Sequence, residues 1–348
     1  MLILGVESSC DETALALVEN GRKVFASEIA SSVAKQAIFG GVVPEIAARE
    51  HLKALVPLLH TLLKNSNKSL EEIDAIAVTR GPGLIGSLLV GVSFAKSLSL
   101  MISKPLIPVD HVHAHLHGAL LGLEETSEEL FPSIGLVVSG GHTNIYYMKN
   151  ETTFEKLVST IDDACGESFD KVGKTLGLPY PGGPHIERIA KSGDKSKYPM
   201  PTMVQEKSRL EFSYSGLKTH VLNTYRKVLN NIPEGDVSTL EAEKCHIAAS
   251  FQEEALGQIA RKIRSVEKLK TDAKSVIIAG GVAANIRFQK ILADKVKKKV
   301  FFPKLKFCSD NAAMIAAYGY HVFEAEQDKN VFSIIDWDPY SRYGANLD

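Results

Sequence analysis

Short apolar runs recur along the chain, and each is followed by small or polar turn residues. Five of them have the length of a buried strand: 2–6, 74–79, 106–109, 134–138 and 276–279. Between them, apolar residues recur at helical spacing, most clearly over 46–63 and 247–263. A further helix is predicted around 314–318, with Ser309 or Asp310 as its N-cap. Strands that alternate with helices predict an α/β fold.

One pattern occurs twice. Residues 4–13 form an apolar strand, a small polar turn and a Thr that opens a second alternating strand, and residues 136–143 begin a similar unit. Two strand–turn–strand units about 130 residues apart are typical of a duplicated, two-lobed nucleotide-binding protein. Two unrelated hairpins are the alternative interpretation of this pattern.

Length and charge narrow the range of functions. A chain of 348 residues is long enough for two domains, and its usage of 45% hydrophobic and 23% charged residues is that of a globular protein. The formal net charge of −1 excludes a general attraction to nucleic acid or anionic membranes. Two local basic groups could still contact RNA phosphates or could simply be solvated helix faces: Arg261, Lys262, Arg264, Lys268 and Lys270, and Lys295 with Lys297–Lys299.

The cysteines and the apolar segments point to the cytoplasm. The four cysteines are far apart and form no CxxC pair, which favours a reducing compartment over a disulfide framework. The most apolar stretch, 84–95, is interrupted by Gly and Ser and is too short to span a bilayer. The N-terminus lacks the basic region of a signal peptide.

Four of the eleven histidines fall within residues 111–117. If this segment is a helix, His111 and His115 share one face at i, i+4 and can reach a single divalent ion. If it is a strand, all four histidines point to the same side. The spacing also resembles that of a zinc protease, but Val112 stands where such a protease needs its catalytic Glu.

Glycine-rich turns follow two of the predicted strands, at 139–143 and at 280–285. Bare backbone amides in such turns can approach phosphate oxygens closely. Neither turn matches the dinucleotide-binding fingerprint or the phosphate-binding P-loop. Asp11, Glu12, Asp170 and Asp310 lie near these turns or near other glycines, where a carboxylate can hold a metal, bind a ribose or act as a base.

Taken in order, these segments resemble the tRNA N6-adenosine threonylcarbamoyltransferase family in its bacterial TsaD form. The shared blocks, besides the histidine cluster, cover nearly the whole chain: GVESSCDET (5–13), GGVVPE (40–45), RGPGLIGSL (80–88), VSGGHT (138–143), FDK (169–171), YPGGP (180–184), FSYSGLKT (212–219), GGVAAN (280–285) and SDN (309–311). So many blocks in the same order are far more specific than any one of them.

The resemblance implies a duplicated two-lobe fold of the actin/Hsp70/sugar-kinase type, with a nucleotide cleft between the lobes. We expect an N-terminal lobe over 1–110, completed by 325–348, and a C-terminal lobe over 111–324 that carries the metal and nucleotide site. The implied reaction moves threonylcarbamoyl from threonylcarbamoyl-AMP to N6 of the adenosine next to the anticodon, in tRNAs that read codons beginning with A.

Site residues follow from the same resemblance, position by position. The implied metal ligands are His111, His115 and Asp310, which would hold one divalent ion per subunit, with Fe²⁺ favoured and Zn²⁺ possible. The implied adenylate-binding residues are Val137, Val138, Ser139, Gly140, Gly141, Asp170, Gly183 and Asn285. Asp11 and Glu12 match a pair that is important for activity. Glu187 stands where some members carry a nucleotide-contacting Asp.

The resemblance also implies partners: tRNA, a paralogous subunit of the same fold (TsaB-like) and a small ATPase (TsaE-like), with no membrane. Apolar faces over 52–63 or 84–100 could bind the paralogue or could be buried in the chain's own core. Two alternatives remain, a metal-dependent glycoprotease and an ATP-hydrolysing or kinase member of the same fold. The absent protease Glu argues against the first, and the histidine pair argues against the second.

Overall fold

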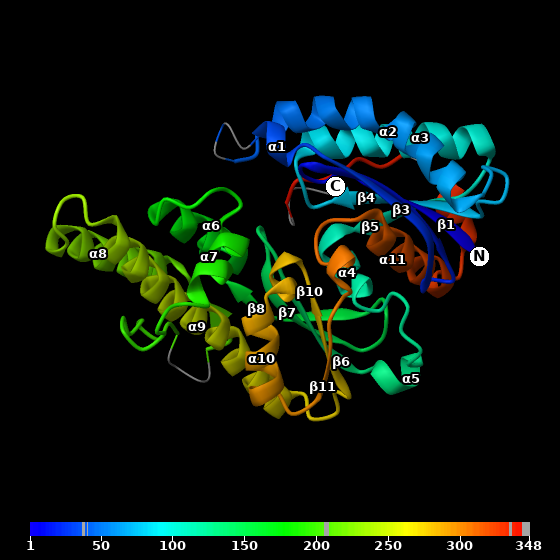
Figure 1. The fold of residues 1–348 in the computed structure, drawn as a ribbon. Coiled ribbons are helices and arrows are strands. Elements are labelled where there is room, and N and C mark those ends of the chain that lie inside the picture. The colour runs from blue at the N-terminus through cyan, green and yellow to red at the C-terminus, as the bar shows by residue number, and fades with distance from the viewer. Residues whose placement is uncertain (37–38, 40, 205–208, 334–335, 343–348) are drawn as a thin grey trace. The chain divides into compact units, whose positions relative to one another are not determined.

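A computed structural model describes residues 1–36, 39, 41–204, 209–333 and 336–342 (Figure 1). The chain divides into two compact units, unit 1 (Met1–Ser127, Asn150–Thr153 and Pro303–Asp348) and unit 2 (Glu128–Lys149 and Phe154–Phe302). The predicted division placed the histidine cluster in the second lobe. In the structure the histidine helix belongs to unit 1, because it packs against the strands and the C-terminal helix of that unit.

Unit 1 is built on a five-stranded sheet with the order β3-β2-β1-β4-β5. Its strands are β1 (Leu2–Glu7), β2 (Glu12–Glu19), β3 (Lys23–Ser31), β4 (Ala75–Gly81) and β5 (Leu106–Asp110). The first three form an antiparallel meander, and β4 and β5 run parallel to β1. Every residue of β1 is buried, as expected for a central strand that helices cover on both faces.

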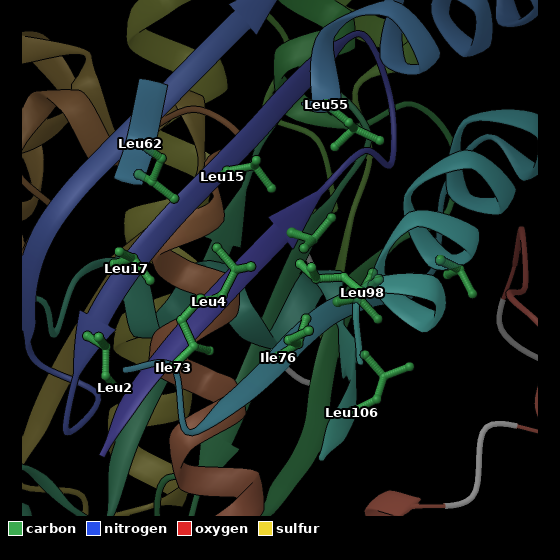
Figure 2. Packing of buried hydrophobic residues seen from close by; sticks show 14 residues of the cluster. Leu2, Leu4, Leu15, Leu17, Leu55, Leu62, Ile73, Ile76, Leu98 and Leu106 are labelled. Carbon is green, nitrogen blue, oxygen red and sulfur yellow. The ribbon is translucent and has the colours of Figure 1, made fainter. Parts of the chain in front are cut away.

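Helices lie on both faces of this sheet. α2 (Pro44–Ser66) and α3 (Ile85–Ile102) pack on one face, while α11 (Ala312–Ala325) packs on β1, β2, β4 and β5. The remaining short elements are α1 (Val33–Gln36), α4 (His111–Gly118), η3 (Leu305–Phe307) and η4 (Lys329–Ser333). Figure 2 shows the core under α2 and α3, where Leu4, Leu15 and Ile76 of the sheet meet Leu55 and Leu98 of the helices.

The apolar stretch predicted at 84–95 is longer in the structure, because α3 continues to Ile102. Among the described residues, α3 is the one helix whose length and composition would allow it to cross a membrane. It buries Leu88, Val92 and Leu98 against α2 and β4, as a core helix of a globular protein does.

Unit 2 contains a six-stranded sheet with the order β11-β10-β6-β7-β8-β9. Its strands are β6 (Ser133–Val138), β7 (Thr143–Met148), β8 (Phe154–Thr160), β9 (Glu211–Phe212), β10 (Ser275–Ala279) and β11 (Lys299–Phe301). Its helices are α6 (Cys165–Thr175), α7 (Gly182–Ala190), α8 (Ser215–Asn231), α9 (Val237–Leu269), η2 (Gly281–Ala284) and α10 (Ile286–Lys295). The short α5 (Ser127–Leu130) lies at the boundary between the units.

The two sheets share one topology. In unit 2, β6, β7 and β8 form an antiparallel meander, and β10 and β11 run parallel to β6, as β4 and β5 do to β1. The duplicated strand–turn–strand pattern therefore corresponds to the β1–β2 and β6–β7 hairpins. The predicted α/β class and the duplicated two-unit plan are confirmed.

Candidate functional site

The histidine segment is a helix, which resolves the alternatives left open by the sequence. Asp110 ends β5 and is the N-cap of α4, since its Oδ1 accepts a hydrogen bond from the His113 amide at 2.9 Å. On this helix the rings of His111 and His115 lie with their centroids 4.7 Å apart. The i, i+4 geometry thus brings two imidazoles to one face.

Asp310 completes a group of three possible metal ligands. Its Oδ1 lies 3.6 Å from Nε2 of His111 and 3.2 Å from Nε2 of His115, and one ligand atom from each residue falls within 4.8 Å of the others. The predicted N-cap of the following helix was wrong. Asn311 caps α11 by accepting a hydrogen bond from the Met314 amide, so the carboxylate of Asp310 is not needed as a cap.

The donor set fits a divalent cation. Both ring nitrogens of His115 are buried without a hydrogen bond among the described residues, although a buried polar atom normally has a partner. Two imidazoles and a carboxylate are ligands that both Fe²⁺ and Zn²⁺ accept.

Glu7, which the sequence analysis did not single out, orients His111. It is fully buried at the end of β1, and its Oε2 lies 3.0 Å from Nδ1 of His111 and accepts a hydrogen bond from Thr79 Oγ1 at 2.6 Å. When His111 donates Nδ1–H to this carboxylate, the lone pair of Nε2 points toward Asp310. A carboxylate behind a histidine ligand is a common feature of metal sites.

Glu7 and His111 each stabilise the charged form of the other. Burial opposes ionisation of Glu7, but the charge and hydrogen bond of His111 lower its pKa. Burial likewise opposes the charge on His111, yet the carboxylates of Glu7 and Asp310 raise its pKa to about 9. A cation that binds Nε2 must therefore displace a proton held by two carboxylates.

Asp11 and Glu12 lie on the turn between β1 and β2, also in unit 1. Burial, with Asp310, Asp11 and Glu7 nearby, raises the pKa of Glu12 to about 7, and burial raises the pKa of Asp11 as well. Glu12 Oε2 is buried without a hydrogen bond among the described residues. A carboxyl group with a pKa near neutrality can exchange protons at physiological pH.

Hydrogen bonds from three elements hold this turn. The carbonyl of Ser9 accepts from the Leu84 amide at 2.8 Å, that of Cys10 from His51 Nε2 at 3.0 Å, and that of Asp11 from the Ser32 amide at 3.0 Å. Because Cys10 offers only a carbonyl, His51 carries its proton on Nε2, and Nδ1 accepts from Thr13 Oγ1. His51 is a second residue that sequence analysis missed, since its partners are 38 and 41 positions away.

His113 and His117 point to the other side of α4, as the helical spacing predicts. His117 is buried, stacks on Tyr318 with ring centroids 4.6 Å apart, and donates Nε2–H to the carbonyl of Glu151 at 2.9 Å. His321 lies beside it at 5.1 Å between centroids. These histidines belong to the packing between α4 and α11.

The predicted adenylate-binding residues all belong to unit 2. Val137 and Val138 are buried in β6, and the turn that follows is closed by a hydrogen bond from the Ser139 amide to the carbonyl of His142 at 2.8 Å. A Cβ at Gly140 or Gly141 would meet no atom within 4 Å among the described residues. These glycines are therefore not required by internal packing, and the space beside them is open to a ligand.

Two other glycines pack closely against the backbone at this turn. A Cβ at Gly280 would lie 2.4 Å from the carbonyl oxygen of Val138, and one at Gly166 would lie 2.6 Å from that of Ser139. Gly280 also has φ of +94°. The turn after β10 continues into η2, and α10 begins only after Asn285.

Asp170 and Asn285 have structural partners of their own. Asp170 Oδ1 accepts from the Gly182 amide at 2.7 Å, at the start of α7, and burial raises its pKa against the hydrogen bonds from Gly182 and Gly183. Asn285 caps α10 through Phe288 N and donates to Gln252 Oε1 at 2.8 Å. Glu187 accepts from the Ile286 amide at 2.9 Å. A Cβ at Gly183 would meet Phe169 Cβ at 4.0 Å, which leaves it nearly open.

Comparison with known proteins decides which reaction this geometry belongs to. The sequence profile of the tRNA N6-adenosine threonylcarbamoyltransferases (TsaD) matches residues 23–317. The chain belongs to this family. It therefore catalyses transfer of a threonylcarbamoyl group to N6 of an adenosine in tRNA.

Members of the tRNA N6-adenosine threonylcarbamoyltransferase family match along nearly their whole length. The protein from Thermosipho africanus is 43% identical over 93% of this chain and 95% of its own. The protein from Chlamydia caviae is 44% identical over 99% and 96%, and that from Staphylococcus aureus is 41% identical over 98% of each.

Solved structures of more distant proteins show the same fold. An activator of 2-hydroxyisocaproyl-CoA dehydratase from Clostridium difficile matches with a TM-score of 0.51 at 14% identity, over 93% of this chain and 96% of its own. Full-length HypF matches with a TM-score of 0.60 at 14% identity, over 93% of this chain and 47% of its own. At this level of identity the likeness concerns the fold alone.

The buried histidines His117, on α4, and His321, on α11, predict that the stability of the fold depends on pH. Burial lowers the pKa of His117, and burial lowers that of His321 to about 4. The unfolded chain, whose histidines titrate near 6.5, binds more protons between about pH 6.5 and 4. The free energy of unfolding should therefore fall as the pH drops through this window, by up to about 1.4 kcal/mol per pH unit for each group.

Urea unfolding at several pH values measures this effect. His321→Leu should show a shallower pH dependence than the unaltered chain, while His60→Leu, at an exposed position on α2, should not. Equal slopes for all three proteins would contradict the assignment.

Proposed function

We propose that this chain uses threonylcarbamoyl-AMP as the donor and modifies the adenosine next to the anticodon, in tRNAs that read codons beginning with A. The family match over residues 23–317 is the observation that carries the transfer reaction. The donor is supported by the open glycine turn after β6, whose bare amides suit the phosphate of an adenylate.

His111, His115 and Asp310 are proposed to hold one divalent cation, with Fe²⁺ favoured and Zn²⁺ possible. The ring nitrogens of His115, which are buried without a hydrogen bond among the described residues, and the Glu7 carboxylate behind His111 support this proposal. When bound, the cation would stabilise negative charge on oxygens of the donor.

The proposed reaction is a direct acyl transfer. N6 of the adenosine attacks the carbonyl carbon of the mixed anhydride, the bond from that carbon to the phosphate oxygen breaks, and AMP leaves. One proton is lost from the attacking nitrogen. Glu12, or Asp11 beside it, is proposed to accept this proton, because a carboxyl group whose pKa is about 7 is half ionised at neutral pH. Val137–Gly141, Asp170, Gly183 and Asn285 are proposed to bind the adenylate.

A same-fold subunit (TsaB-like) and a small ATPase (TsaE-like) are the proposed partners, in the cytoplasm. Four apolar side chains support a docking face on unit 1: Leu52 and Val56 of α2 are 72% and 54% exposed, and Ile85 and Leu89 of α3 are 47% and 46% exposed. α2 and α3 pack together, with Ala48 close to Gly86. Helix faces of this kind are usually covered by a partner.

Reconstitution tests the proposed function. The chain is incubated with unmodified tRNA and threonylcarbamoyl-AMP, with and without both partner proteins, and the nucleosides are analysed. We expect threonylcarbamoyladenosine next to the anticodon only when the partners are added. Robust multiple turnover by the chain alone would contradict partner dependence, and no product in the complete mixture would contradict the proposed donor.

Alanine variants of the histidines on the two faces of α4 should differ in metal affinity. His111→Ala and His115→Ala should each lower the affinity for Fe²⁺ or Zn²⁺ by more than about 100-fold, since loss of a supporting residue alone costs 10–100-fold. His113→Ala is the matched control and should keep one ion per chain. His117→Ala is a poor control, because this buried ring carries packing and a hydrogen bond. Metal content by mass spectrometry decides, and full occupancy in His115→Ala would exclude that ligand.

The open glycine turn predicts that a larger side chain at Gly141 lowers the affinity for AMP. Gly141→Val should weaken AMP binding at least about tenfold, which corresponds to about 1.4 kcal/mol. The free energy of unfolding should change by less than about 0.5 kcal/mol, because a Cβ at this position meets no atom within 4 Å among the described residues. Ala293→Val adds bulk at an exposed position of α10 and should leave binding unchanged. Calorimetry with AMP measures both variants, and unchanged binding by Gly141→Val would remove this turn from the site.

A further inference from the structure

Positive charge is concentrated in one part of unit 2. Residues 264–299 contain ten Lys and Arg against three Asp and Glu, in a chain whose formal net charge is −1. The remainder of the chain is therefore clearly acidic. Such an asymmetry within a nearly neutral protein marks a local surface for a polyanion.

The structure joins two basic groups that are separate in the sequence. Glu267, near the end of α9, accepts hydrogen bonds from the amides of Lys297 and Lys298, both at 3.1 Å. Lys298 Nζ also donates to the carbonyl of Thr271 at 3.3 Å. α10 packs against α9. The last turns of α9 and the segment that follows α10 therefore form one continuous surface, and the carboxylate of Glu267 is occupied by backbone amides.

Three of the basic residues noted in the sequence are already engaged elsewhere. Arg261 pairs with Glu254, and the buried Lys262 donates to the carbonyl of Arg209 at 2.6 Å. Lys270 pairs with Glu155 at 2.7 Å. These side chains are used within the protein and are poor candidates for binding RNA.

Five others are exposed, and their side chains form neither an ion pair nor a hydrogen bond with the described residues. We call them the basic edge: Arg264, Lys268, Lys290, Lys295 and Lys297. Arg264 and Lys268 are one turn apart on α9 and so share a face. Besides Glu267, residues 264–299 contain only two carboxylates, Asp272 and Asp294. Asp272 accepts a hydrogen bond from Tyr147.

The edge lies at the opposite end of β10 from the glycine turn. Lys299, two residues after Lys297, pairs with Ser275 at the start of β10, whereas Gly280 follows the end of β10. Ser275 and Gly280 are about 16 Å apart at the usual rise per residue. A ligand that spans this distance and carries many negative charges is an extended nucleic acid. An RNA duplex presents phosphates every few ångströms along its length, as DNA does.

We propose that the basic edge binds the phosphate backbone of the tRNA substrate, away from the adenosine that is modified. The inference rests on the transfer of threonylcarbamoyl to tRNA, which family membership establishes. Contacts of this kind position the RNA without reading its sequence. They should therefore govern the affinity for tRNA and its salt dependence, and leave the chemical step unchanged.

A charge-removal triple tests the proposal. Arg264→Gln, Lys268→Gln and Lys297→Gln are combined in the full chain. The control triple is Lys191→Gln, Arg226→Gln and Lys227→Gln, which removes the same charge from exposed positions of unit 2. Binding of an unmodified tRNA transcript is measured by fluorescence anisotropy at several salt concentrations, and kinetics are measured in the complete reaction with the partners.

The edge triple should bind tRNA roughly 10–100-fold more weakly, and the slope of log K against log salt should fall by about 2 to 3, about one for each phosphate that the variant no longer neutralises. KM for tRNA should rise while kcat stays unchanged, and the control triple should behave as the unaltered chain. Equal losses in both triples would show a general charge effect and overturn the proposal. Unchanged tRNA affinity in the edge triple would also overturn the proposal. If activity were lost while the affinity for tRNA stayed unchanged, the result would indicate a protein partner at this surface. Failure of the unaltered chain to modify tRNA in the complete reaction with the partners would instead count against the proposed function.

Discussion

The site in unit 1 depends on how closely α11 approaches the central sheet. A Cβ at Gly5 would lie 2.1 Å from the carbonyl oxygen of Ala312, and one at Gly319 would lie 2.5 Å from Cβ of Ala77. Only glycine permits this contact on β1, and the contact fixes the first turn of α11. Asp310, two residues before that helix, is thereby held beside a helix that lies some 200 positions earlier in the chain.

Glycines in this chain serve two opposite purposes, and the structure separates them. Gly5, Gly166 and Gly280 are closely surrounded by backbone atoms, so they allow segments of the protein to pack. Gly140, Gly141 and Gly281 have open space where a side chain would be. The second kind marks the turns after β6 and β10, which are equivalent ends of neighbouring parallel strands. Ligands in open α/β sheets bind at such strand ends.

Local sequence patterns correctly predicted the elements that depend on neighbouring residues alone. The five apolar runs became β1, β4, β5, β6 and β10 within a residue or two, and the spacing of His111 and His115 correctly anticipated one helix face. Contacts between distant positions could not be anticipated in this way. Glu7 lies 104 positions from His111, and no local pattern links them. The cap at Asn311 was missed because Ser309 and Asp310 are equally good capping residues by type.

The order of the segments in unit 1 has a consequence for synthesis of the protein. Unit 1 includes residues from both ends of the chain, whereas unit 2 lies almost entirely between them. When the ribosome has made β1 to α4, the sheet has no α11 to cover its second face, and His111 and His115 lack Asp310. Both arrive only after residues 154–302 have been translated. Unit 2 can therefore fold on the ribosome before unit 1 is complete, and the nascent N-terminal half must wait with an uncovered apolar sheet. The three-ligand cluster can form only after Asp310 has been synthesised.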